Sequence, residues 1–545
     1  MFHRSRCARI NVKLLVVLIV VTVALGVSLV AARQIHRSAL SERALAAGEA
    51  AFGSKDWPAA VKNYRRYLGR NPDNIEILRK YAEACLSIRP LDAATVGGAI
   101  SAYRRVMQLT SFDETACERL AMLYGSIGNF GELASIARAR IEHDPNDRQG
   151  PLWLAEALIR LNKTAAARQT LQTLIEDIET LPDRHVEYVR ACVQMSQLAD
   201  SATSPQPETP AGAENAAPPT PLEWLNKAVE YAPDSVEALV CRAQFHRRTA
   251  GSPDANEQGR SASLALARQD FDAADAHGTD DPRIRLVLGA EWMAFGELDR
   301  VAAELRAVDK LLQEKLEAGF FDVGDWTVAR FLLASELATR KGAATEAASL
   351  ADEALAVLKE QRHRVRVLPS AIPLYVAAGK VSEARRFLDE YLGLLHAQEG
   401  SRESPRRLAG LQALVAGAEN RPYAVIDALE PVVGNDSSGS GLRRLLAEAY
   451  DRTGQAGRAV KALGQYRRLN PQDPQAMREL ARQYSRLADW KNAVEAATLA
   501  ESLGSTDVAL KLLRIGASIN LMIARRDGAP TEEIKRLSAE LADLR

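Results

Sequence analysis

The sequence contains no arrangement of residues that is typical of a catalytic site. Its eight histidines stand far apart, and none belongs to an HxxxH or HExxH motif. It has no GxSxG motif, no Walker-type phosphate-binding loop and no glycine-rich dinucleotide fingerprint. Acidic residues pair only as they do on any solvated helix face. These absences predict a protein that is not an enzyme and that binds no cofactor.

Cysteine is scarce, and its spacing excludes two further classes of protein. The five cysteines of the 545-residue chain form no CxxC pair and no other metal-binding pattern. We therefore expect neither a metal site nor a disulfide scaffold, and we interpret these residues as small buried hydrophobes. They are Cys7, Cys85, Cys117, Cys192 and Cys241.

An excess of charge of either sign is also missing. Lysine and arginine together number 70, and so do aspartate and glutamate. Such a balance creates no long-range field that would attract nucleic acid, so we expect no nucleic-acid partner. The chain is nevertheless too long for one compact core of usual size, which predicts several domains or an array of repeats.

One long hydrophobic run is present, near the N-terminus. Residues 14–32 contain no charged side chain, and a helix of that length at about 1.5 Å per residue spans roughly the 30 Å hydrocarbon core of a membrane. This predicts a transmembrane helix that acts as a signal anchor. A signal peptide cleaved after Ala32 is the alternative.

The charges beside this run predict its orientation. Residues 1–13 carry four basic residues and no acidic one, which favours a cytoplasmic N-terminal tail. The expected localisation is a single-pass membrane protein whose remaining chain is extracytoplasmic, and periplasmic if the source is bacterial.

Beyond the hydrophobic run, the chain repeats itself. Ala447, Tyr450 and Ala459 recur 34 residues later as Ala481, Tyr484 and Ala493. The same spacing of small and large residues, with a central glycine and a closing proline, recurs in earlier segments. Examples are Gly48, Trp57, Ala60, Tyr64 and Pro72; Leu120, Ala121, Tyr124, Gly128, Leu133, Ala137 and Pro145; and Leu288, Gly289, Trp292, Gly296, Val301 and Leu305.

Each repeat has the properties of a helical hairpin. Apolar residues three, four and seven positions apart mark one face of each helix. The central glycine ends the first helix where a left-handed residue is needed, the small residues let the two helices approach, and proline closes the unit. Because one hairpin cannot bury its apolar face alone, neighbouring hairpins must stack.

These positions resemble the tetratricopeptide repeat (TPR) family. The resemblance implies an all-α, right-handed superhelical solenoid of about a dozen TPR-like hairpins over most of residues 41–525, preceded by the transmembrane helix. It also implies that the partner is a protein or peptide.

Two segments interrupt or end the repeats. Residues 200–221 hold six prolines and no aromatic or basic residue, so we expect a disordered linker between repeats at 41–199 and at 222–525. The linker is either a loop within one hairpin or a hinge between two arrays. Residues 531–545 place Ile534, Leu537, Leu541 and Leu544 on one stripe, which favours a C-terminal capping helix over a short dimerising coil.

The resemblance also indicates where a ligand would bind. In the family, positions two, five, nine, twelve and thirteen of a unit face the groove, and the lysines and asparagines of the family's clamp for a carboxyl-terminal peptide are missing here. Two units instead place five arginines at such positions. An acidic ligand suits guanidinium groups, whereas a solvated face paired with Glu448, Asp451 and Glu479 is the alternative. The arginines are Arg444, Arg452, Arg478, Arg482 and Arg486.

The predicted function is therefore a membrane-anchored scaffold for protein–protein interaction at the cell envelope. An assembly or export component for envelope polysaccharide or protein, with an arginine-lined groove for an acidic ligand, is one alternative. An enzyme with an unrecognised domain is the other, although repeats, linker and anchor leave little of the chain for a catalytic fold.

Overall fold

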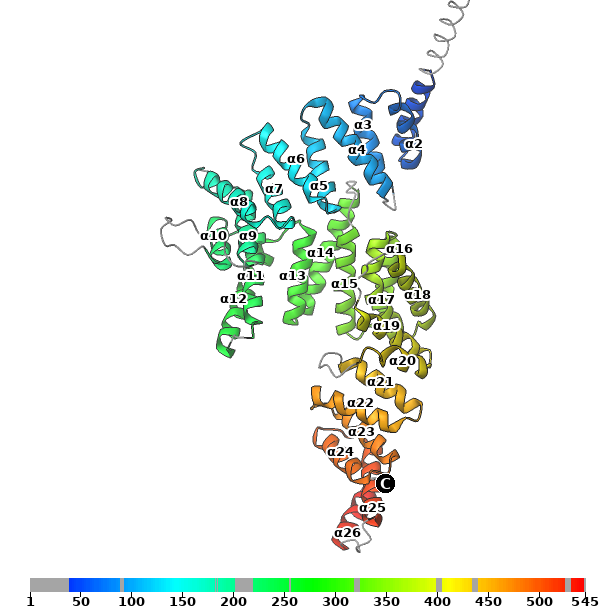
Figure 1. Cartoon of the computed structure of the whole chain (residues 1–545). Helices are drawn as coiled ribbons and strands as arrows, with labels where there is room; N and C mark the ends of the chain where they lie inside the picture. Colours follow the sequence, from blue (N-terminus) through cyan, green and yellow to red (C-terminus); the bar gives the residue numbers. More distant parts are fainter. Residues whose placement is uncertain are drawn as a thin grey trace, which may run out of the picture. The chain divides into compact units, whose positions relative to one another are not determined.

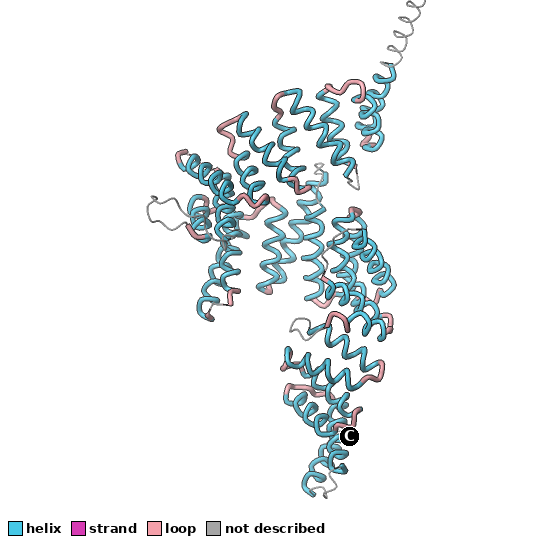
Figure 2. The backbone as a smooth tube through the Cα atoms, in the orientation of Figure 1, coloured by secondary structure: helices cyan, strands magenta, loops and turns pink. Residues whose placement is uncertain are grey.

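A computed structural model describes nearly all of the chain beyond the N-terminal segment. The described residues are 39–88, 93–181, 183, 185–200, 219–253, 256–317, 324–397, 404–433, 440–524 and 531–543. Every regular element in these ranges is a helix (Figure 1, Figure 2). The predicted all-α class is confirmed for this part of the chain.

The chain divides into two compact units, residues 1–323 and 324–545, which are described separately. The described part of unit 1 begins with a helix at residues 39–53. The helices that follow it are α2 (Trp57–Leu68), α3 (Ile75–Ser87), α4 (Ala93–Thr110), α5 (Glu114–Ser126), α6 (Phe130–His143), α7 (Gln149–Arg160), α8 (Thr164–Glu179), α9 (Val186–Asp200), α10 (Pro221–Tyr231), α11 (Val236–Ala250), α12 (Glu257–His277), α13 (Pro282–Phe295) and α14 (Leu298–Glu317).

Unit 2 continues the same pattern of helices. These are α15 (Gly324–Arg340), α16 (Ala344–Val357), α17 (Gln361–Ala377), α18 (Val381–Ala397), α19 (Pro405–Ala418), α20 (Pro422–Leu429), α21 (Ser440–Arg452), α22 (Ala456–Leu469), α23 (Pro474–Arg486), α24 (Trp490–Ser502), α25 (Val508–Ala524) and α26 (Thr531–Asp543).

Within each unit, consecutive helices pack as hairpins, and each hairpin packs on the next. In unit 1, α3 packs on α4, α5 on α6, and α7 on α8, while α4 and α6 contact the helices that follow them. In unit 2, α21 packs on α22 and α23 on α24 in the same way (Figure 1). The result is the helical solenoid that the repeats predict.

The turn inside a hairpin explains the central glycine. Gly128, Gly296 and Gly454 have φ angles of 72°, 79° and 75°, which lie in the left-handed region that glycine adopts without steric cost. Asn162 and Ala488 occupy the same turn in other hairpins, with φ angles of 59° and 56°. The turn geometry is therefore kept even where glycine is replaced.

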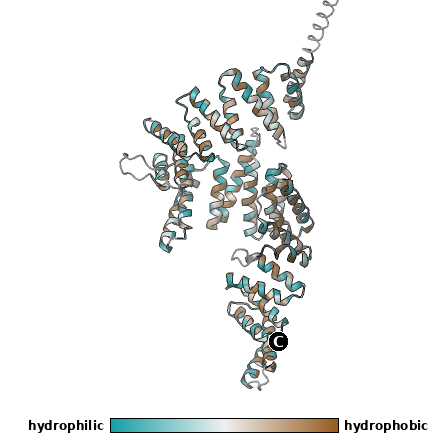
Figure 3. Cartoon of the chain, viewed as in Figure 1, coloured by the Kyte–Doolittle hydropathy of each residue, from teal (hydrophilic) through white to brown (hydrophobic). Residues whose placement is uncertain are grey.

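The small residues of the repeat lie where two helices meet. Ala447 and Ala481 are 2% and 0% exposed, and Ala459 and Ala493 are both fully buried. No larger side chain would fit there without moving the helices. Figure 3 shows the accompanying alternation of apolar and polar residues along the helices, which leaves the apolar faces for packing.

The helices on either side of the proline-rich segment form one hairpin. The rings of Tyr188 in α9 and Tyr231 in α10 stack with their centroids 4.1 Å apart. The Tyr231 hydroxyl also accepts a hydrogen bond of 2.9 Å from the backbone N–H of His185. Residues 201–218 of the predicted linker lie outside the described residues.

The localisation expected from the sequence is corrected here. In the ranges that the structure describes, no helix is both long and apolar enough to cross a membrane. The long helix α12, for example, carries Arg268 and Asp270 near its middle. The tail at 1–13 and the span expected at 14–32 lie outside the described residues. The single-pass membrane localisation is therefore not retained.

Candidate binding grooves

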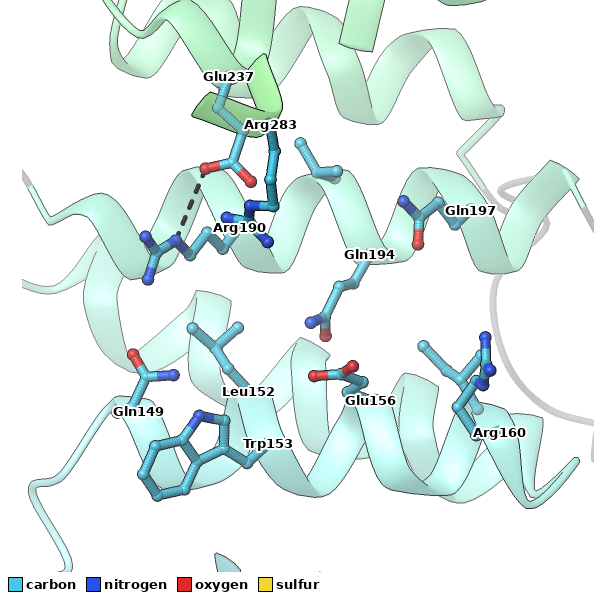
Figure 4. A pocket seen from close by; sticks show the side chains of 12 residues that line it. Gln149, Leu152, Trp153, Glu156, Arg160, Arg190, Gln194, Gln197, Glu237 and Arg283 are labelled. Carbon is cyan, nitrogen blue, oxygen red and sulfur yellow. Dashed lines mark ion pairs between the residues drawn. The ribbon is translucent and has the colours of Figure 1, made fainter. Parts of the chain in front are cut away.

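Unit 1 has a hollow of about 480 Å³ that is lined by the first helices of four consecutive hairpins (Figure 4). We call it the amide groove, because three glutamine side chains face it from α7 and α9. The lining residues are Gln149, Leu152, Trp153, Glu156, Ile159 and Arg160 of α7, Arg190, Val193, Gln194 and Gln197 of α9, Glu237 of α11 and Arg283 of α13.

The amide groove has an unsatisfied hydrogen-bonding group. The Oε1 atom of Gln194 is buried and has no hydrogen-bond partner. A buried polar atom without a partner costs roughly 1–3 kcal/mol. An amide carries both donors and an acceptor, so either orientation of this side chain leaves a polar atom that a ligand in the groove could satisfy.

Aromatic and charged groups complete the amide groove. Trp153 lies against the guanidinium group of Arg140, whose Cζ is 5.1 Å from the ring centroid. Arg190 pairs with Glu237 across two helices at 3.6 Å (Figure 4). The lining thus combines an aromatic ring, side-chain amides and charges of both signs. Such a mixture suits a polypeptide better than a ligand whose charges all have the same sign.

Arg283 is held in place at the end of the amide groove. Its Nη2 atom lies 2.7 Å from Oδ2 of Asp281, whose Oδ1 accepts a hydrogen bond from the backbone N–H of Arg283 at the N-terminus of α13. Burial by itself would raise the pKa of Asp281, but the hydrogen bonds from Arg283 outweigh it and lower that pKa. The carboxylate therefore stays ionised and fixes the arginine.

A second hollow of about 460 Å³ adjoins the amide groove, because Val193 and Gln197 line both. It also contains Cys241 and Arg247 of α11. Burial raises the pKa of the Cys241 thiol to about 12, so the thiol is protonated at neutral pH and is no nucleophile. Cys85, Cys117 and Cys192 are buried, as interpreted from the sequence, whereas Cys7 lies outside the described residues.

The five predicted arginines lie on α21 and α23 of unit 2, and each has a partner within the chain. Arg444 is 3.8 Å from Glu479, Arg452 is 3.2 Å from Glu448, and Arg478 is 3.0 Å from Asp507. Arg482 and Arg486 share the carboxylate of Asp451. Most of these ion pairs join residues of neighbouring repeats. The binding of an acidic ligand by the five arginines stays a prediction.

Arg452 alone among the five lines a hollow found in unit 2. That hollow has a volume of about 150 Å³ and is lined by the first helices α17, α19 and α21 together with α20. Its lining is largely apolar and includes Val376, Leu414 and Leu445. It offers much less room than the amide groove.

The amide groove was missed by the sequence analysis, although the signal was present. The groove positions of the repeat, applied to a unit that begins at Arg148, select five residues that all line the hollow. They are Gln149, Leu152, Glu156, Ile159 and Arg160. The arginine-rich units drew attention to α21 and α23 because their charges were more conspicuous.

Comparison with known protein families found a match for one hairpin of the chain, that of α7 and α8. Residues 152–177, which span most of α7 and α8, match the model of the tetratricopeptide repeat family. The hairpin that forms one wall of the amide groove is therefore similar to a tetratricopeptide repeat. This match confirms the resemblance for that hairpin. No curated protein matches the chain.

The solved structures that are similar to this chain include the following three. The APC/C hetero-tetramer Cut9-Hcn1 is 12% identical, with 88% of this chain and 96% of that chain covered and a TM-score of 0.36. The TPR domain of P58(IPK) is 13% identical, covering 89% and 99%, with a TM-score of 0.30. A tetratricopeptide repeat protein from Parabacteroides merdae is 13% identical, covering 50% and 93%, with a TM-score of 0.32.

Proposed function

We propose that this protein is an interaction scaffold that binds an extended segment of a partner protein in the amide groove. The observation that carries the proposal is the alignment of Gln149, Gln194 and Gln197 in one hollow that crosses four hairpins. Each residue of an extended peptide offers one N–H and one C=O group. Glutamine amides can pair with both, whatever the side chains of the peptide are.

The size of the amide groove supports an extended segment. Helices pack about 8–10 Å apart, so four consecutive first helices cover roughly 30 Å. A strand advances about 3.3 Å per residue, which gives a bound segment of roughly nine residues. Trp153 provides a flat apolar surface for one side chain of such a segment, while Glu156 and Arg160 provide charges that select among sequences.

The proposal is tested with a phage library of random twelve-residue peptides, selected against the full-length protein. The groove variant combines Glu156→Arg with Gln197→Arg, two exposed positions where long cationic side chains would fill the hollow. We expect the selected peptides to bind this variant at least tenfold more weakly than wild type.

A matched control makes the same charge change elsewhere. Gln172→Arg with Glu176→Arg alters two exposed residues of α8 that do not line the groove. Peptide affinity should be unchanged in this control, with circular dichroism unchanged in both variants. Selected peptides that bind the groove variant as well as wild type, or a library that yields no binder, would contradict the proposal.

A further inference from the structure

The amide groove contains a carboxylate that has no ionic partner of its own. Glu156 is exposed on α7 and lines the hollow. Within the part of the chain that the structure describes, its side chain takes part in no ion pair and no hydrogen bond. An ionised carboxylate accepts hydrogen bonds and donates none, and it forms its strongest bonds with cationic donors.

The arginines of the same lining are already engaged. Arg190 and Arg283 each form an ion pair with a carboxylate of the chain. The guanidinium group of Arg160 lies over the ring of Phe130, with its Cζ atom 4.9 Å from the ring centroid. Of the charges that line the groove, that of Glu156 is therefore left for a ligand to compensate.

A second acceptor faces this carboxylate from the neighbouring hairpin. Figure 4 shows the Gln194 amide of α9 and the Glu156 carboxylate of α7 directed toward one another. The Oε1 atom of Gln194 is buried and has no hydrogen-bond partner. Neither this oxygen nor the carboxylate can donate a hydrogen bond to the other. The space between them suits a group that donates several hydrogen bonds.

We infer that the amide groove selects a segment with a basic side chain, lysine or arginine, which binds between Glu156 and Gln194. This inference rests on the proposed function of the groove and names the side chain that the bound segment presents at its centre. An ammonium or guanidinium group has several N–H donors and no acceptor, so it can bond to both oxygens at once. A neutral donor would leave the charge of Glu156 uncompensated.

Trp153 provides a surface for the rest of such a side chain. It precedes Glu156 by three residues on α7, so the two lie on the same face of the helix, and both line the hollow. The carbon chain of lysine or arginine is apolar. It can therefore lie along the indole ring while its charged end reaches the carboxylate.

The charge of Glu156 already acts inside the groove. The pKa of Arg283 is raised mainly by its hydrogen bonds to Asp281, and the negative charges of Glu237 and Glu156 contribute as well. Arg283 belongs to α13 and Glu156 to α7, so the field of this carboxylate extends across the groove. A cationic side chain that enters between them moves toward a negative charge that no described cation pairs with directly.

Sequencing of peptides selected from the random twelve-residue phage library tests the inference. Selection against the full-length wild type should enrich lysine or arginine at one position of the binders. Selection against Glu156→Arg should enrich aspartate or glutamate there instead. Glu176→Arg changes an exposed residue of α8 outside the groove, so this matched control should give the wild-type pattern.

Two further variants distinguish selection of a basic residue from damage to the groove. Replacing the basic residue of a selected peptide by glutamine should weaken its binding to wild type at least tenfold, but its binding to Glu156→Gln less than twofold. Gln194→Glu adds a second carboxylate beside the first, so it should bind the unchanged peptide at least threefold more tightly. A variant that merely loosened the fold would not gain affinity.

The outcomes separate this inference from the proposed function. Binders that are lost in the variant with Glu156→Arg and Gln197→Arg, yet show no preference for basic residues, would overturn the inference and leave the proposed function standing. A library without binders, or binders that no change in the groove affects, would overturn both. Equal losses of the glutamine-substituted peptide on wild type and on Glu156→Gln, or a folded Gln194→Glu variant that binds no more tightly, would also overturn the inference.

Discussion

At the scale of single residues, the repeat period places chemically different residues in the same backbone conformation. Gly454 and Ala488 stand 34 residues apart and end the first helix of two successive hairpins, with φ angles of 75° and 56°. A left-handed conformation costs a residue with a Cβ atom roughly 1–2 kcal/mol, and costs glycine almost nothing. The second hairpin is therefore strained at a position where the first is not.

Exchanging the two residue types should change stability in opposite directions. Gly454→Ala should destabilise unit 2 by about 1 kcal/mol, because an added Cβ has no neighbour within 4 Å and only the backbone strain counts. Ala488→Gly should stabilise it by up to about 1 kcal/mol, less the entropy that glycine adds to the unfolded chain. Urea unfolding followed by circular dichroism measures both. Changes of the same sign would contradict the role given to this turn.

At the scale of elements, a capping residue begins many of the helices. Asp473 precedes α23, and its Oδ1 atom accepts hydrogen bonds from the backbone N–H groups of Gln475 and Ala476 at 2.9 and 3.4 Å. The Tyr466 hydroxyl of α22 donates to its other oxygen at 2.8 Å. The same carboxylate therefore caps one helix and attaches it to the preceding hairpin.

The cap of α23 gives a prediction about pH. Burial alone would raise the pKa of Asp473, but the hydrogen bonds from Tyr466 and the two backbone N–H groups outweigh it, and the pKa is lowered. A lowered pKa means that the ionised side chain stabilises the fold above about pH 4, the value of an unperturbed aspartate. This stabilisation is lost as the pH falls through the pKa of the folded state.

Two variants distinguish the hydrogen bonds of the Asp473 cap from the negative charge of its carboxylate. Asp473→Ala should cost about 1 kcal/mol at pH 7, because the cap is removed. Asp473→Asn keeps an acceptor oxygen, so it should cost less, and its difference from wild type should disappear below the folded-state pKa. Unfolding free energies measured from pH 2 to 7 check this. A difference between the Asp473→Asn variant and wild type that stays constant over that range would contradict it.

Most of the helical hairpins could be located from the sequence, because the residues of each repeat determine its own local structure. The positions of Ala447 and Ala459, and the glycine between them, locate a hairpin without any knowledge of its neighbours. The ion pairs were harder, since Arg478 pairs with Asp507 and Arg486 with Asp451, and these partners lie in the adjacent repeat. The exposure of Leu512, Ile519 and Ile523 on α25 could not be predicted, because only the structure shows which side of this helix stays uncovered.

At the scale of the whole chain, cores are formed by neighbouring hairpins. In unit 2, one core contains Val328 and Phe331 of α15, both fully buried, and extends to Leu411 and Val415 of α19. A second core begins on α19 with Ala409 and Ala413 and extends to α25. Helix α19 thus contributes to both cores, so each hairpin stabilises the next as in other solenoids.

This continuity predicts that residues 324–545 fold as an independent unit. The fragment retains both cores, so we expect helical circular dichroism and a cooperative thermal transition. A matched fragment of residues 344–545 lacks α15 and loses Val328 and Phe331 from the first core. Removing even one large buried side chain costs roughly 3–5 kcal/mol, so the shorter fragment should melt at a clearly lower temperature. Equal melting temperatures would mean that α15 does not support the hairpins that follow it, which is incompatible with a core that begins on that helix.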